Sequence, residues 1–226
     1  MDEKQKPDAP LRPRKVPVQE RSKESIRRLL EATHRLLKRD GPKGVTTPNI
    51  ARESGISVGS IYQYFPNKEA IILALYELKL ADIRAIATAP VVVADGDWRG
   101  FIRAWITHIK REEAAIDFDL SMNEAMEHFP DLRAISRRHA DMFADIIIGH
   151  LKRFGSTWPD AALYDLATHV FFLNSALWLY WSHAGQSLSH GIDRLADGAI
   201  ALLAPAIEGG EPPPPPYAVH RTEPQE

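Results

Sequence analysis

Side chains that could contact a nucleic acid gather in one short segment of the first third of the chain. At 100° per residue, Tyr62 and Gln63 fall with Gly59 on one face of a short helix, opposite Ile61 and Phe65. The phenol and the amide can donate hydrogen bonds to bases and phosphates in a DNA major groove. The glycine lets the backbone approach another surface closely. This face is therefore a candidate DNA-reading surface.

Lys68 follows this helix after a short turn, in the first turn of a helix that is expected to open at Asn67. The helix dipole disfavours a cation at that end. A phosphate could bind the ammonium together with the first backbone amides of the helix. An ordinary exposed lysine is the alternative, but the neighbouring hydrogen-bonding face favours the phosphate.

Three predicted helices position these side chains. The first covers about residues 20–39 and ends at an Asp-Gly-Pro sequence. Thr47 is expected to cap the second helix, and Gly55 supplies the positive φ that closes it. Ser57 then caps the third helix. Two short helices joined by a tight turn are the layout of a helix-turn-helix.

The charge of the chain is divided unevenly along its length. Residues 1–68 contain 15 Lys and Arg and 8 Asp and Glu, whereas residues 69–226 contain 13 and 22. A basic first third suits a polyanionic partner, and DNA would repel the acidic remainder. Chance alone could produce such a difference, but its coincidence with the helix-turn-helix favours DNA binding.

Several functional classes lack their sequence signatures. The 226 residues include no cysteine, which excludes disulfides and thiolate nucleophiles. The N-terminus has no apolar run typical of a signal peptide, and no segment suits a membrane span. HExxH, a glycine-rich phosphate loop and a nucleophile–base pair are all absent. We therefore expect a soluble cytoplasmic protein that is not an enzyme, needs no cofactor or metal and contacts no membrane.

The first helix ending in DGPKGVTT, the block IARESGISVGSIYQYFPNKEAI and the long helix after it together resemble the TetR family of transcriptional regulators. The resemblance extends from Val18 to about Leu80. A block of this length is far more restrictive than a lone glycine motif. The resemblance implies an all-α homodimer in which each subunit presents one helix-turn-helix to successive major grooves.

Carried over position by position, the resemblance also implies contacts with double-stranded operator DNA. Pro48 stands where the family often has a basic or polar residue, so a base contact is least expected there. The DNA-facing residues would be Thr47, Pro48, Val58, Gly59, Ser60, Tyr62, Gln63 and Tyr64, with Lys68 on a phosphate and Arg12, Arg14 and Lys15 of the N-terminal arm in a flanking groove.

The predicted fold class is all-α, with an N-terminal three-helix helix-turn-helix domain and a C-terminal helical bundle for ligand binding and dimerisation. Residues 1–17 are expected to form a disordered basic arm and residues 208–226 a disordered proline-rich tail. The DNA-binding domain would cover 18–66 and the bundle 67–207. Helical periodicity predicts helices at about 67–87, 97–115, 117–128, 130–154, 160–183 and 189–203.

The predicted helix at 160–183 is apolar nearly all round. One stripe includes Val170 and Leu177, and a second includes Phe171 and Trp181. A helix with two apolar faces must be covered on both, and a second copy of the chain is a natural cover. The family's dimer interface, built from the last two helices of each subunit, fits that need. A central helix in a larger monomeric core is the alternative.

A small-molecule effector would bind within the bundle, among aromatic and methionine side chains. Polar groups on the apolar helix need partners if they are buried, and a ligand, a second subunit or a neighbouring side chain could supply them. Many of the candidates would simply be core. The ligand-binding candidates are Trp105, Phe118, Met122, Met126, Phe143, His169, Asn174 and Trp178.

The sequence therefore favours a homodimeric repressor that a small-molecule effector of unknown identity releases from its operator. An activator or a ligand-independent regulator of the same fold is one alternative. A helical interaction protein whose helix-turn-helix is only scaffold is the other.

Overall fold

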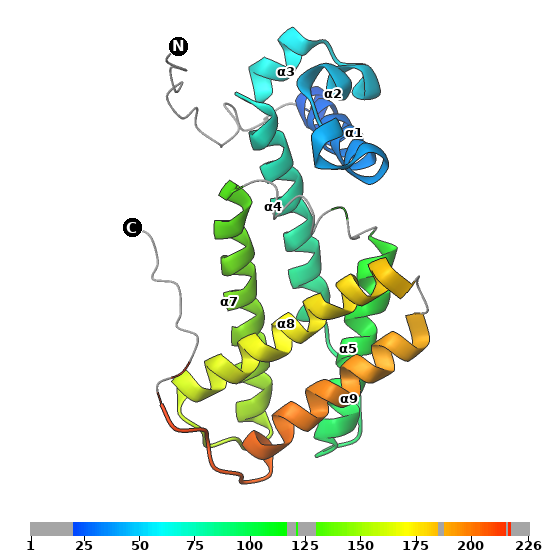
Figure 1. The fold of residues 1–226 in the computed structure, drawn as a ribbon. Helices are drawn as coiled ribbons and strands as arrows, with labels where there is room; N and C mark the ends of the chain where they lie inside the picture. The colour runs from blue at the N-terminus through cyan, green and yellow to red at the C-terminus, as the bar shows by residue number, and fades with distance from the viewer. Residues whose placement is uncertain (1–19, 117–120, 122–129, 185–187, 216, 218–226) are drawn as a thin grey trace. The chain divides into compact units, whose positions relative to one another are not determined.

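The structure is a computed structural model, and it describes residues 20–116, 121, 130–184, 188–215 and 217. Within these ranges the chain forms eight helices and no strand, which confirms the predicted all-α class (Figure 1). Apart from residue 121, the predicted helix at 117–128 lies outside the described residues, as do the predicted arm 1–17 and residues 216 and 218–226 of the predicted tail. The helices are α1 Glu20–Gly44, α2 Thr47–Ser54, α3 Val58–Tyr64, α4 Lys68–Ala87, α5 Trp98–Ala115, α7 Pro130–Arg153, α8 Asp160–Ala184 and α9 Leu188–Ile207.

The helices group into two compact units. Unit 1 contains α1, α2, α3 and the first part of α4, as far as Lys79. Unit 2 contains the rest of α4, α5, α7 from Ala134, α8 and α9. The long helix α4 therefore belongs to both units.

The local sequence explains how the helices of unit 1 begin and end. The backbone leaves the helical conformation at Gly41, where the sequence predicts a break, and one more helical turn follows to the end of α1. The predicted cap of α2 is wrong by one residue. Thr46, not Thr47, adopts an extended conformation and accepts a hydrogen bond from the Asn49 amide at 3.3 Å. Gly55 closes α2 with φ 67°, as predicted.

Apolar side chains and ion pairs hold unit 1 together. Its core includes Leu29 and Leu36 from α1, Ile50 from α2 and Phe65 after α3, all fully buried. At the surface, Glu53 of α2 accepts hydrogen bonds from two arginines of α1: Arg35 at 2.8 Å and Arg39 at 3.1 Å. The same pairing lowers the pKa of the Glu53 carboxyl. Burial supplies most of the stability here, because exposed ion pairs contribute little.

Unit 2 is a helical bundle in which α9 packs against both α5 and α8. Buried residues on facing helices include Ile102 of α5, Ile147 of α7 and Leu203 of α9. Polar contacts add cross-links: the Tyr164 hydroxyl of α8 donates to Asp141 of α7, and Arg103 of α5 pairs with Asp197 of α9. The bundle thus has a closed apolar interior with polar links between neighbouring helices.

Helix α9 extends beyond its predicted end at residue 203. The prediction is wrong because α9 passes through Pro205 and ends at Ile207. A proline cannot donate to the carbonyl four residues earlier. Here both Ala201 and Pro205 are exposed, so water can satisfy that carbonyl. Beyond the helix, the Gly210 carbonyl accepts a hydrogen bond from the Trp158 indole at 2.6 Å.

The described residues cover helix α8 on one side only. Ala162, Val170 and Trp181 are buried, in agreement with the predicted apolar stripes. In contrast, Phe172 is 58% exposed and Tyr180 is 48% exposed. These two aromatic side chains lie on a common face of the helix, eight residues apart in sequence. The two rings thus form an exposed aromatic patch among the described residues.

Candidate DNA-binding and ligand-binding sites

The predicted division of α3 into two faces is confirmed. Ile61 is 1% exposed and Phe65 is fully buried, so they fix the helix to the core of unit 1. On the opposite face Tyr62 is 44% exposed, and Gly59 and Gln63 are also exposed. A seven-residue helix is unstable alone. Packing of its inner face against the core of unit 1 therefore stabilises the helix and fixes the position of the exposed Tyr62 and Gln63 side chains.

The residues on the flanks of α3 have two different environments: one takes part in the helix cap, and the others are exposed to different degrees. The Ser57 hydroxyl accepts a hydrogen bond from the Ser60 amide at 3.2 Å and lies 2.8 Å from the Ser60 hydroxyl. Ser60 thus takes part in the cap of the helix. Val58 is exposed, with 39% of its surface accessible, whereas Tyr64 is half-buried. Val58 is consequently the more accessible of these two flanking side chains.

The two predicted residues of α2 lie in its first turn. Pro48 is exposed, and its missing N–H costs nothing in this first turn. Thr47 is partly buried. The side-chain amide of neighbouring Asn49 donates a hydrogen bond to the Gly44 carbonyl at 2.8 Å, which ties the start of α2 to the end of α1.

Lys68 is the first residue of α4. The helix begins one residue after the predicted start at Asn67, and the Asn67 side chain accepts a hydrogen bond from the Ala70 backbone amide at 2.8 Å, so it caps the helix. A capped helix start still presents backbone N–H groups and a positive dipole end. The ammonium of Lys68 adds a full positive charge at this end. The arrangement suits a phosphate group.

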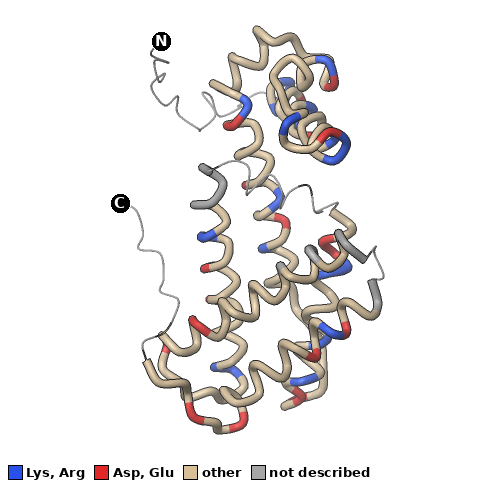
Figure 2. Tube along the Cα trace, in the orientation of Figure 1, with Lys and Arg blue, Asp and Glu red and all other residues tan. Residues whose placement is uncertain are grey.

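Positive charge dominates residues 20–68 of unit 1. Residues 20–68 contain ten Lys and Arg and five Asp and Glu, and Figure 2 shows many of the cations along α1. Several acidic groups are engaged by arginines within the unit: Glu24 pairs with Arg27 at 2.6 Å, and Asp40 with Arg39 at 2.9 Å. The surface is therefore suited to a polyanion. The predicted arm residues Arg12, Arg14 and Lys15 lie outside the described residues.

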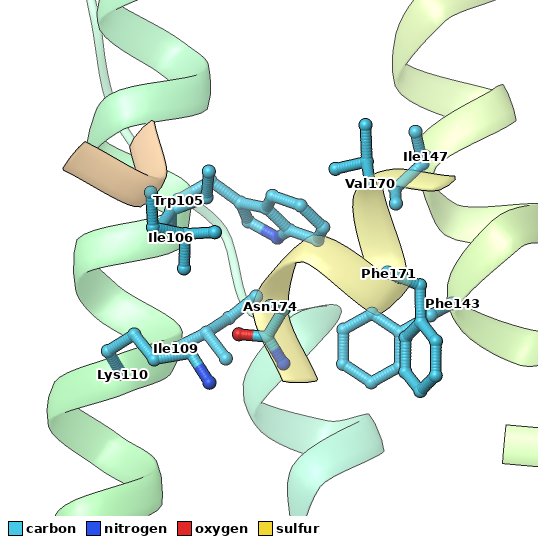
Figure 3. Close-up of a pocket in the computed structure, with 10 residues that line it drawn as sticks. Trp105, Ile106, Ile109, Lys110, Phe143, Ile147, Val170, Phe171 and Asn174 are labelled. Carbon is cyan, nitrogen blue, oxygen red and sulfur yellow. The ribbon is translucent and has the colours of Figure 1, made fainter. Parts of the chain in front are cut away.

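A cavity lies between α5, α7, α8 and α9 in unit 2. The centre of a water-sized sphere can move through about 40 Å³ of it. Figure 3 shows that aromatic and aliphatic side chains form most of its wall, with one ammonium and one amide. The lining residues are Trp105, Ile106, Ile109, Lys110, Phe143, Ile147, Val170, Phe171, Asn174 and Leu195.

Aromatic contacts order one side of this wall. The rings of Phe143 and Phe171 lie 5.6 Å apart, and those of Trp105 and Phe143 lie 6.4 Å apart. The Trp105 indole donates to the carbonyl of Ala87, the last residue of α4, at 2.9 Å. Trp105 therefore contacts both the cavity and the end of the helix that both units share.

Lys110 and Glu113 form an ion pair on α5, and each residue is only 3% exposed. Such a pair is costly to bury, because both charges lose their hydration. Sequence reasoning missed Lys110 as a cavity residue. The signal was available, because both residues continue the stripe of Ile102 and Ile106, where the helical period predicts apolar side chains.

Two histidines near the cavity are held in the neutral form. The pKa of His139 falls to about 4, first through burial and then through the charge of Lys110. The pKa of His150 also falls to about 4, through burial and then the charge of Arg153. His150 Nε2 is buried and has no hydrogen-bond partner within the described chain. The His150 ring lies 5.1 Å from that of Trp105.

The predicted ligand residues have different positions. Trp105, Phe143 and Asn174 lie in the cavity wall. His169 does not join them: its side chain is exposed on α8, and it is not among the residues of the wall. Its sequence neighbours Thr168 and Val170 are both buried, but successive side chains of a helix point about 100° apart, so His169 can face solvent between them. Phe118, Met122 and Met126 lie outside the described residues, as does the side chain of Trp178.

Comparisons with known proteins agree with the geometry of unit 1. A family model described as bacterial regulatory proteins, tetR family, matches residues 29–75. The HTH-type transcriptional regulator BetI from Burkholderia mallei is 28% identical over 198 residues, which cover 79% of this chain and 93% of that relative. The chain belongs to the TetR family of transcriptional regulators. This regulator is also 36% identical over 74 residues to the tetracycline repressor protein class A of Escherichia coli, over 33% of each chain.

The fold comparison extends the likeness beyond unit 1. Two TetR-family transcriptional regulators from Streptomyces coelicolor match with TM-scores of 0.59 and 0.62, at 20% and 19% identity. The matches cover 80% and 82% of this regulator and 99% and 97% of those chains. The whole described architecture is therefore a TetR-family fold, with an N-terminal helix-turn-helix and a C-terminal helical domain.

The described ranges contain neither a metal-ligand cluster nor a membrane-spanning helix. No group of three or more His, Asp or Glu side chains there could hold a metal ion. No helix of this part of the regulator is long and apolar enough to cross a membrane.

Proposed function

We propose that this DNA-binding regulator is a homodimeric repressor, acting in the cytoplasm, that a small-molecule effector releases from a near-palindromic operator. One observation supports operator binding most strongly. The exposed phenol, amide and backbone of α3 form a polar face, and buried Ile61 and Phe65 hold the helix from behind. Such a face matches the hydrogen-bonding groups at base edges in a major groove.

In this proposal the side chains divide the work of recognition. Gln63 and Tyr62 read base edges, and Lys68 with the first amides of α4 contacts a phosphate. Gly59 lets the start of α3 approach the DNA backbone closely. The other proposed contacts are Thr47, Pro48, Val58, Ser60 and Tyr64, with Arg12, Arg14 and Lys15 of the N-terminal arm.

The proposed dimer would bury the exposed aromatic face of α8. Phe172 and Tyr180 contribute large apolar surfaces there, and Leu202 of α9 is 38% exposed. Burial of such side chains is favourable by roughly 25 cal/mol per Å² of apolar surface. A twofold axis would place the same face of a second copy opposite it. The two recognition helices would then read half-sites about 34 Å apart, one turn of DNA.

Effector release requires a connection between the cavity and the DNA-binding unit. The Trp105 indole supplies one, because it lines the cavity and donates to the carbonyl of Ala87 at the end of α4. We propose that an effector displaces this contact and favours a second position of α4. The effector can shift the equilibrium only by its preference for one of the two states.

Fluorescence anisotropy with duplexes from the gene's upstream region tests operator binding. Gln63→Ala should lose about 1–3 kcal/mol on the preferred site and little on random DNA. Lys68→Ala should weaken binding to every duplex and reduce the salt slope by about one. Lys152→Ala is the control, because Lys152 is an exposed lysine of α7 in unit 2.

Weak and equal binding of all four proteins to every duplex would refute the proposal and favour the interaction-protein alternative. If specific binding is found, the position of the operator relative to the promoter distinguishes a repressor from an activator. An operator that overlaps the promoter supports repression.

A further inference from the structure

We propose that the cavity of unit 2 recognises a small uncharged apolar molecule, of the size of a single aromatic ring or a short hydrocarbon chain. This inference rests on the proposed effector site and names its ligand class. The starting observation is the composition of the wall, because eight of the ten described residues that line it are aliphatic or aromatic. Figure 3 shows aromatic rings from α5, α7 and α8 among them.

The polar groups of the wall are already engaged within the protein. Lys110 forms an ion pair with Glu113 on the same helix, and each residue is only 3% exposed. The two charges cancel, so the pair offers a ligand no net charge. The Trp105 indole N–H donates to the Ala87 carbonyl at 2.9 Å. Asn174 is half-buried and keeps part of its surface at solvent. What remains for a ligand to contact is mainly carbon.

The surroundings of the aromatic wall oppose a charge of either sign. The ring of His139 lies 5.0 Å from that of Phe143 and 5.6 Å from that of Phe171. Burial is the main reason that the pKa of His139 falls to about 4, with a smaller effect of the Lys110 charge. The imidazole is therefore uncharged at neutral pH. The same loss of hydration would act against a charged ligand beside these two rings.

Charged ligands are the competing possibility, and each sign meets a specific obstacle. An anion would have to share Lys110 with Glu113, whose buried carboxylate repels it. A cation could bind over the faces of Trp105, Phe143 or Phe171. It would then lie in the same low-dielectric wall as the Lys110 ammonium. An uncharged apolar molecule meets neither obstacle and loses no favourable hydration on entry.

The size of the cavity limits the ligand. About 40 Å³ is accessible to the centre of a water-sized sphere, and one water needs roughly 10–15 Å³ by that measure. A single ring can enter with small movements of side chains. Toluene, benzoate and benzylammonium are therefore suitable probes, because they share one ring with one substituent carbon and differ in charge.

Isothermal titration calorimetry of the full chain without DNA tests the proposal. Toluene should bind at least about tenfold more tightly than benzoate or benzylammonium. Val170→Phe fills the cavity from α8 and should abolish toluene binding, because Val170 is 5% exposed and lines the wall. Val92→Phe is the matched control. Val92 is 94% exposed and outside the wall, so this variant should keep the affinity of the wild type.

A milder variant covers the case in which Val170→Phe does not fold. Val170→Ile adds one methylene group to the wall and should weaken toluene severalfold. Three results would overturn the proposal: no binding of toluene up to its solubility in water, binding of either charged probe as tight as that of toluene, or unchanged toluene affinity in the folded Val170 variants. Operator affinity, measured separately by anisotropy, reports on release. Toluene that binds selectively but leaves operator affinity unchanged would support the ligand class and contradict the proposed release.

Discussion

Replacement of Gly59 by alanine separates the stability of α3 from its proposed role at DNA. A Cβ built on Gly59 meets no other atom within 4 Å, and the residue is exposed. The isolated protein therefore has no steric need for a glycine at this position. Alanine favours a helix by about 0.5–1 kcal/mol over glycine. Gly59→Ala should consequently raise the free energy of unfolding, by up to that amount.

The expected effect on DNA binding has the opposite sign. If the backbone of α3 lies against the DNA, an added methyl group must push the two surfaces apart. Insertion of a methyl group into a packed contact costs about 1–3 kcal/mol. A loss in this range weakens binding at least roughly fivefold. The mutant would thus be more stable and bind its operator less tightly.

Gly149→Ala is the matched control. Gly149 is also an exposed helical glycine with no atom within 4 Å of a built Cβ, but it lies in α7 of unit 2. Urea unfolding gives the stability of both variants, and fluorescence anisotropy gives their operator affinity. Gly149→Ala should gain stability and keep its affinity. Equal operator affinities of the two variants would refute a close approach of Gly59 to DNA.

Three further predictions concern unit 2. Lys110→Met leaves the Glu113 charge buried alone and should lower the free energy of unfolding by about 3–5 kcal/mol in urea, while the added change Glu113→Gln should restore most of it. The pKa of His139 falls from 6.5 to about 4 on folding, so the unfolded chain binds more protons between these values, and stability should fall by up to about 2 kcal/mol as the pH drops to 5. His139→Gln should flatten this part of the pH profile in thermal unfolding, whereas the same change at exposed His169 should not. Trp105→Phe removes the donor to the Ala87 carbonyl; it should cost about 1 kcal/mol of stability and reduce the change in operator affinity at saturating effector. An unchanged effector response in Trp105→Phe would contradict the proposed connection to α4.

Local sequence rules predicted unit 1 well, because short-range physics determines most of it. The break at Gly41, the left-handed Gly55 and the cap at Ser57 each depend on a few neighbouring residues. The two faces of α3 follow from helical geometry alone. The one error, the cap at Thr47, arose because two adjacent threonines are equally suited to cap α2. Thr46 is the one whose hydroxyl meets the Asn49 amide.

The cavity was harder to predict, because it depends on which helices face one another. Periodicity identified apolar stripes on α8 but did not show that Asn174 would line a cavity while His169 would be exposed. The buried pair of Lys110 and Glu113 was visible as two charges on an apolar stripe of α5. Lys110 lines the cavity together with Phe143 and Phe171, which come from distant parts of the sequence. Single-helix rules contain no information on such contacts.

The central claim is that this regulator reads a specific operator as a dimer. A selection of bound fragments from sheared genomic DNA tests it most directly, followed by the stoichiometry of the recovered complex. The account predicts one enriched near-palindromic sequence with half-site centres about 10 base pairs apart, bound by two chains. Recovery of unrelated fragments without a shared sequence, or binding of a single chain to a single half-site, would contradict it.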